Sequence, residues 1–190
     1  MGSQLAYYSL TERFKLNSVL GKVVAQYGNP KGSREAIAVT INALETALDK
    51  DKNEWIYWYT LGEYYLATEE FAKFFYAAQK CFDLKPKDVR SSYVLATACN
   101  ELSKAKFVGD TERFEEVATL VGLNQLPADY VYNPEKCQEA LEELGLTIDQ
   151  CAMKAITLFQ MLLREKLPPE DKKNIQVSLE GLQYVFPNLR

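Results

Sequence analysis

The chain has 190 residues, 47% of them hydrophobic, which is enough for one domain with a sizeable core. Its net charge is −4 and its lysines and arginines form no basic run, so nucleic acid is not expected as its main partner. No apolar stretch approaches the roughly 20 residues that span a bilayer, and the N-terminus shows no secretory signal. We therefore expect a soluble cytoplasmic protein without a membrane partner.

The first two helices are predicted from their end signals. Ser9-Leu-Thr-Glu12 has the form of a capping box, and the turn-forming run 28–32 ends the helix that it opens. Apolar residues between these signals recur every three or four positions, as on one face of a helix. Ser33 is expected to cap a second helix, which ends in the polar run 49–53.

Seven more helices are predicted along the rest of the chain. Asn133-Pro134 favours a helix start, because Asn caps and Pro fits the first turn. Thr147-Ile-Asp-Gln150 is a second capping box, and Pro168-Pro169 separates the last two helices. The expected ranges are about 54–67, 69–84, 88–102, 110–122, 134–145, 147–165 and 170–185, with a Pro-containing loop at 124–133. The sequence therefore predicts an all-α fold.

One motif carries more information than the periodicity. Trp58-x2-Leu61-Gly62-x2-Tyr65 is followed by Pro86, 28 residues after the tryptophan. Leu61 and Tyr65 lie one turn apart on a helix, and Gly62 leaves room for a second helix to pack closely. Proline ends that second helix and turns the chain.

These residues resemble the tetratricopeptide repeat, whose signature is W-x2-L-G-x2-Y, then A-x3-F, then P. Where that family has a small residue and an aromatic one four positions later, this chain has Phe74 and then Ala78. Exchanging large and small residues is compatible with a constant volume at the helix contact. Moving 34 residues forward takes Leu61-Gly62 to the similar pair Leu95-Ala96.

The resemblance implies a right-handed superhelical solenoid of antiparallel helix hairpins in a single domain, 1–190. Its repeats would cover about 12–52, 53–86 and 87–122, and divergent helical pairs with a C-terminal cap would cover 123–190. It implies no catalysis. The chain contains no histidine, which is the commonest general base near neutral pH, and no phosphate loop or dinucleotide fingerprint is present. An enzyme that uses Glu, Lys or Cys stays open as an alternative.

No metal or cofactor is expected. The four cysteines lack closely spaced pairs, and Cys81, Cys99 and Cys151 lie among apolar residues at helical spacing, which predicts small buried thiols. The aromatic residues between 55 and 76 are interpreted as core packing between hairpins, with an aromatic cofactor site as the alternative. Acidic pairs such as Glu69-Glu70 are interpreted as solvated surface.

The resemblance further implies a scaffold or adaptor that binds a peptide or partner protein in a concave groove. Tyrosine offers an apolar ring and a hydroxyl, a combination favoured at binding surfaces. The repeat frame predicts that a partner segment with apolar and acidic residues is bound by Tyr59, Glu63, Leu66, Arg90, Tyr93, Thr97 and Lys22. Tyr59→Ala and Tyr93→Ala are each expected to weaken binding by about 2 kcal/mol with little loss of stability.

Other interpretations remain open at this point. The C-terminal helices would fill the groove, or the tyrosines would be ordinary surface residues. A function from another class is self-assembly into a homo-oligomer, through an exposed C-terminal face around Phe159, Met161 and Tyr184. A third is an enzyme accessory domain that binds a small ligand. Because Tyr59 and Glu63 stand where chaperone-tail binders of the family hold a terminal carboxylate, that specialised function is not expected.

Overall fold

The computed structural model of the protein describes residues 8–120 and 133–189. Within these ranges the regular structure consists of nine α-helices and a short 3-10 helix, η1, with no strand. Their bounds are α1 Leu10–Tyr27, α2 Arg34–Lys50, α3 Trp55–Ala67, α4 Phe71–Leu84, α5 Val89–Ser103, η1 Lys104–Phe107, α6 Thr111–Leu120, α7 Pro134–Leu144, α8 Ile148–Leu163 and α9 Pro169–Val185. The all-α prediction is confirmed. The predicted end of the sixth helix and nearly all of the loop 124–133 lie outside the described residues.

The predicted end signals act as expected. The Ser9 hydroxyl accepts a hydrogen bond from the backbone N–H of Glu12, and the Glu12 carboxylate accepts one from the N–H of Ser9. Thr147 and Gln150 form the same reciprocal pair at the start of α8. Asn133 caps α7, and Pro134 stands in its first turn. Each signal satisfies orphan backbone donors locally, so neighbouring residues suffice to fix these ends.

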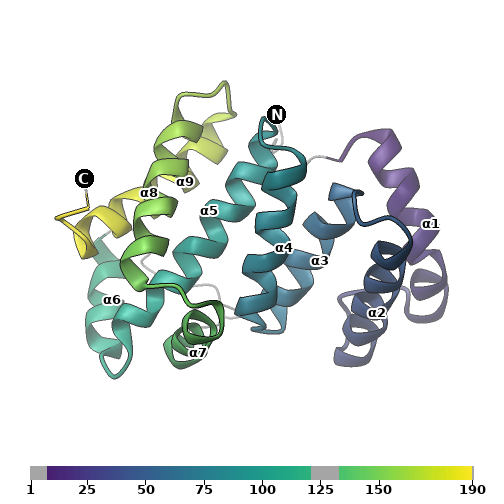
Figure 1. Cartoon of the computed structure of the whole chain (residues 1–190), viewed down its shortest axis with the longest axis horizontal. Coiled ribbons are helices and arrows are strands. Elements are labelled where there is room, and N and C mark those ends of the chain that lie inside the picture. Colours follow the sequence, from purple (N-terminus) through teal and green to yellow (C-terminus); the bar gives the residue numbers. More distant parts are fainter. Residues whose placement is uncertain (1–7, 121–132, 190) are drawn as a thin grey trace.

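The helices follow one another along the long axis of the molecule, from α1 at one end to α6, α8 and α9 at the other (Figure 1). From α1 to α5, each helix packs on the next one along the chain. The order then changes, because the most extensive packing partner of α5 is α8, whereas α6 packs on η1 and α9. The repeat predicted at about 87–122 would instead have paired α5 with α6.

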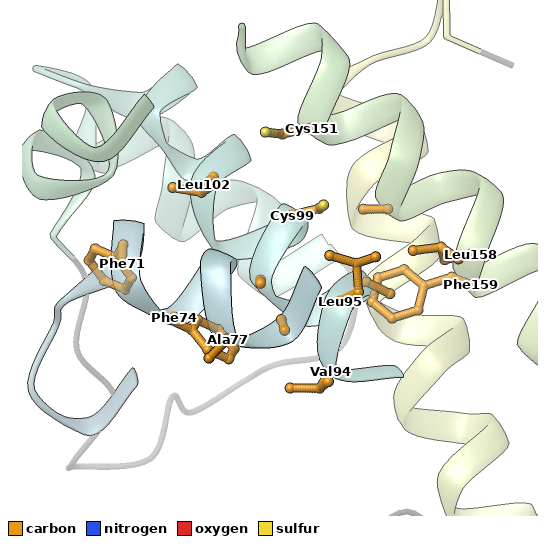
Figure 2. Packing of buried hydrophobic residues seen from close by; sticks show 14 of the residues in the cluster. Phe71, Phe74, Ala77, Val94, Leu95, Cys99, Leu102, Cys151, Leu158 and Phe159 are labelled. Atoms are coloured by element: carbon orange, nitrogen blue, oxygen red, sulfur yellow. The ribbon is translucent and has the colours of Figure 1, made fainter. Parts of the chain in front are cut away.

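The turn between α5 and α6 explains this change. Residues 104–107 form η1 instead of an open loop, and Gly109 follows with a φ of +73°, a left-handed conformation that glycine adopts without strain. Leu95 and Cys99 of α5 lie on the side of that helix that faces α8 (Figure 2), and α8 has small buried residues of its own, including Ala152. Small residues on both helices allow their axes to approach closely.

Gly62 lies at the contact between α3 and α4, as its motif predicted. A methyl group built on Gly62 would lie 3.5 Å from Cδ2 of Phe74 and 3.7 Å from Cβ of Ala77. These are ordinary van der Waals distances, so a single methyl fits, whereas a longer side chain would meet the Phe74 ring. Phe74 and Ala78 are both buried in this hairpin.

The centre of the core lies where α5 meets α8. Leu95 of α5 and Phe159 of α8 lie side by side there and are fully buried (Figure 2). Phe159 therefore belongs to the core, which corrects its assignment to an exposed C-terminal face; Met161 and Tyr184 are exposed. All four cysteines are free and buried, as predicted for three of them from their spacing.

Candidate functional site

A surface groove of about 650 Å³ lies along α3. Figure 1 shows α3 between α2 and α4, and these three helices with the end of α7 form its walls and floor. We call it the α2–α4 groove, and its lining residues are Glu45, Leu48, Asp49, Lys52, Trp58, Leu61, Tyr65, Ala72, Lys73, Tyr76, Glu143 and Leu144.

One face of α3 supplies the floor of the groove. Trp58, Leu61 and Tyr65 are spaced by three and four residues, so a helix places them in one row. Leu61 and Tyr65 are buried, and Trp58 is half-buried. These are residues of the repeat motif, and the same spacing that packs them on α2 and α4 also leaves the outer edge of the row accessible.

An aromatic pair forms one rim of the groove. The rings of Trp58 and Tyr76 meet edge to face, with centroids 5.6 Å apart and planes at 74°. Trp58 Nε1 donates a hydrogen bond of 2.9 Å to the carbonyl of Lys52, which fixes the orientation of the indole. Tyr76 is 52% exposed although its ring packs on Trp58. Oriented aromatic rings that remain accessible at a groove are suited to bury an apolar group of a ligand.

The floor also carries a buried polar group. Tyr65 Oη donates a 2.6 Å hydrogen bond to Oε1 of Glu45 on α2. Burial, followed by the hydrogen bond to Glu45, raises the pKa of Tyr65 above its usual value, so its hydroxyl stays protonated. Lys73 Nζ lies 5.3 Å from the centroid of the Tyr65 ring and forms an ion pair with Glu70. These contacts connect α2, α3 and α4 across the groove.

A second hollow of about 310 Å³ continues the groove toward α7 and shares Ala72, Lys73 and Glu143 with it. At its far end Glu69 Oε2 accepts a hydrogen bond of 2.8 Å from Asn133 and forms an ion pair of 3.0 Å with Lys136. Glu69 has a φ of +59°, unusual for a residue other than glycine. Its two contacts hold the α3–α4 turn against the start of α7.

The predicted binding residues lie elsewhere, and several of them are covered. Tyr59 is only 6% exposed, with its ring 6.0 Å from that of Tyr8 and 5.8 Å from that of Trp55, centroid to centroid. Glu63 accepts a hydrogen bond of 3.4 Å from the Tyr8 hydroxyl and forms an ion pair of 3.2 Å with Lys31. Tyr8, which lies just before α1, therefore covers this part of α3.

Arg90 connects α1 to α5. Its guanidinium donates two hydrogen bonds to the Glu12 carboxylate, at 2.9 and 3.1 Å, and two to Asp88, at 2.7 and 3.0 Å. Its Cζ also lies 4.6 Å from the centroid of the Trp55 ring. A planar guanidinium provides such bidentate and stacked contacts together. The hydrogen-bond donors of Arg90 are thus engaged by Glu12 and Asp88, and the residue has a structural role.

Of the other predicted residues, three are half-buried and one, Lys22, is exposed. Tyr93 is half-buried against Phe159 of α8, with ring centroids 6.5 Å apart, and Thr97 bonds the Tyr93 carbonyl at 2.9 Å. Leu66 is half-buried in the core, and Lys22 is exposed on α1. Lys22 stands ten residues from Glu12, about 15 Å along the helix. The structure brings Tyr59, Glu63 and Arg90 together under α1, and it leaves Lys22 apart from them.

Sequence reasoning missed the α2–α4 groove because it treated its aromatic residues as core. A signal for it did exist. Trp58, Leu61 and Tyr65 form one row on α3, whereas Tyr59 and Glu63 project roughly from the opposite side. Aromatic residues on two sides of one helix mean that both sides can contact other groups. Which of them stays accessible depends on the packing of α1, which the row pattern does not determine.

The described residues show no group of three or more Cys, Asp or Glu side chains arranged to hold a metal ion. None of the described helices combines the length and the apolar character required to cross a membrane. Comparison with protein-family models, curated proteins and solved structures yields no match to this chain.

Proposed function

We propose that this chain is a protein-binding scaffold or adaptor, not an enzyme, and that its docking site is the α2–α4 groove. The observation that carries the proposal is the Trp58–Tyr76 pair, whose rings stay accessible at the rim of a 650 Å³ groove. Aromatic residues in such positions dominate the binding energy of protein interfaces. The walls are helices tied to each other by Tyr65–Glu45 and by the α3–α4 packing, so the site is preorganised.

The proposal includes a tetratricopeptide-like architecture, a solenoid of helix hairpins. The serial packing of α1 to α5 and the close contact at Gly62 support it. In this arrangement α2 and α4 are the second helices of adjacent hairpins. The concave groove expected from the sequence would then be the face of Tyr59, and the α2–α4 groove lies on the other side of α3. Because Tyr59 is buried, Tyr59→Ala should now cost stability as well as any binding that it supports.

The test compares two tyrosines with equal exposure. Tyr76 and Tyr184 are both 52% exposed, but only Tyr76 lines the groove. Native lysate is passed over the immobilised parent chain and over Tyr76→Ala and Tyr184→Ala, and the retained proteins are quantified by mass spectrometry. Loss of a groove anchor should weaken a true partner by about 2 kcal/mol, roughly 30-fold, in Tyr76→Ala alone. Retention that is equal on all three proteins would contradict the proposal.

A second candidate function is self-association through the C-terminal face. Met153 and Met161 of α8 and Tyr184 of α9 are exposed apolar side chains, each about half accessible. Exposed apolar patches commonly mark interfaces between protein molecules. Light scattering during size-exclusion chromatography measures the molar mass and so tests self-association. A monomeric mass at all tested concentrations would exclude this function.

A further inference from the structure

The charges that surround the α2–α4 groove identify the chemistry of its occupant. The main hollow and its continuation toward α7 carry six carboxylates and three lysines. Two of the lysines are already neutralised, because Lys73 pairs with Glu70 and Lys136 with Glu69. The remaining charged groups are the carboxylates of Glu45, Asp49, Glu139 and Glu143 and the ammonium of Lys52.

These four carboxylates form no ion pair among the described residues. Glu45 accepts a hydrogen bond from the neutral hydroxyl of Tyr65, which orients the carboxylate without cancelling its charge. Asp49, Glu139 and Glu143 are exposed on the walls of the groove, and no ion pair joins any of them to a described lysine or arginine. The groove is therefore acidic as well as aromatic.

The spacing of the carboxylates adds a second argument. Glu45 and Asp49 are four residues apart on α2, and Glu139 and Glu143 are four residues apart on α7. Like charges at this separation lie on the same side of a helix and destabilise it slightly. Each pair therefore lowers the stability of the free protein slightly, and a bound basic side chain would relieve this repulsion. Such complementarity also steers association and selects among partners.

We infer that the α2–α4 groove binds a basic segment of a partner protein, which places an apolar or aromatic side chain against Trp58 and Tyr76 and its lysines or arginines beside the carboxylates of α2 and α7. This inference rests on the proposed function and specifies its ligand. The aromatic floor and the volume define the site, and the charge selects the occupant. Nucleic acids and anionic lipid surfaces do not fit, because their phosphates would meet the same carboxylates.

The test uses random 12-residue peptides displayed on phage and selected on the immobilised full chain. Peptides that also bind Tyr76→Ala are removed by counter-selection. The expected survivors combine lysine or arginine with an aromatic or large aliphatic residue. The affinity of a synthetic survivor is then measured by fluorescence anisotropy for the parent chain and for the double variant Asp49→Lys, Glu143→Lys.

The double variant should bind the basic peptide at least about tenfold more weakly, and added salt should weaken binding to the parent chain. Glu165→Lys is the matched control, since it reverses an exposed carboxylate outside the groove and should leave the affinity unchanged. Circular dichroism confirms that each variant is folded.

The possible failures are distinguishable. Survivors that depend on Tyr76 but are neutral or acidic would overturn the inference about charge and leave the docking site in place. A selection that yields no Tyr76-dependent peptide would overturn both the inference and the proposed function. A dimer of the chain that Tyr76→Ala dissociates would put a second copy in the groove and would likewise overturn the inference.

Discussion

Helices α1 and α3 are attached to the molecule in different ways. Of the eighteen residues of α1 only Val23 is buried, whereas eight of the thirteen residues of α3 are buried. Leu10 and Phe14 of α1 even point outward, with 82% and 76% of their surface exposed. Helix α3 is therefore held by apolar burial, which acts over its whole length.

Helix α1 packs on α2 with side chains that are mostly only partly buried, such as Leu16 and Leu20, and it has polar contacts near its start. Glu12 meets Arg90, Lys15 forms an ion pair with Glu54, and Tyr8, just before the helix, reaches Glu63. An isolated helix of this length is marginal in water, so α1 depends on these polar contacts together with its limited packing on α2. The comparison implies that α1 can detach while the rest stays folded, and that α3 cannot. The following experiments examine that difference, beginning with the largest expected effect.

Leu95→Ala should cause the largest loss, because Leu95 is fully buried where α5 meets α8. Truncation of a core leucine leaves a cavity and typically costs about 2–5 kcal/mol of unfolding free energy. Leu10→Ala on α1 is the control and should change stability by less than about 0.5 kcal/mol. Urea denaturation followed by circular dichroism measures both, and equal losses would contradict the contrast between the two regions.

Gly62→Leu should destabilise the α3–α4 hairpin by about 1–3 kcal/mol, because the larger side chain must displace the Phe74 ring. Gly62→Ala should be mild, since a methyl group fits there and alanine has the better helix propensity. Thermal melting of the two variants gives the comparison. An unchanged melting temperature for Gly62→Leu would show that α3 and α4 are less closely packed than described.

Arg90→Ala should release the start of α1 and lower the global unfolding free energy by only about 1 kcal/mol, as for ion pairs that are not fully buried. The specific readout is hydrogen exchange by mass spectrometry. Peptides from α1 should exchange faster in the variant, while those from α3 and α4 should keep their protection. Lys22→Ala, which removes an exposed charge from the same helix, should change neither region.

Acidification should weaken the same attachment. Burial alone would raise the pKa values of Glu12 and Asp88, but hydrogen bonds from Arg90 outweigh it and hold both below their ordinary values. Groups with lowered pKa values stabilise the folded form fully above their unfolded values of 4.5 and 3.8, and this contribution is lost as the pH falls through the folded values. The exchange difference between the parent chain and Arg90→Ala should therefore be present at neutral pH and shrink as the pH falls through the lowered pKa values of Glu12 and Asp88. A difference that persists in acid would mean that Arg90 acts through its stacking on Trp55.

Local sequence was a good guide wherever a few neighbouring residues decide the outcome. The capping residues Ser9, Asn133 and Thr147 set helix starts. Gly62 in the motif predicted a close contact between two helices, which the structure places between α3 and α4. The candidate site was harder to predict. Tyr59 and Glu63 lie on one face of α3, but nothing nearby in the sequence indicates that Tyr8 and α1 cover that face.

By itself, therefore, the sequence determined the helices, most of their ends and the buried thiols, because hydrogen-bonding and periodicity within about four residues suffice for these features. Tertiary structure alone decided that α8 rather than α6 covers α5, that Arg90 is used to hold α1, and that the row of Trp58 rather than that of Tyr59 remains accessible. Each of these outcomes depends on contacts between residues far apart in the chain, such as Glu12 and Arg90, 78 positions apart. Apolar periodicity shows that a face must be covered, and the competition among distant helices for that face decides which one covers it.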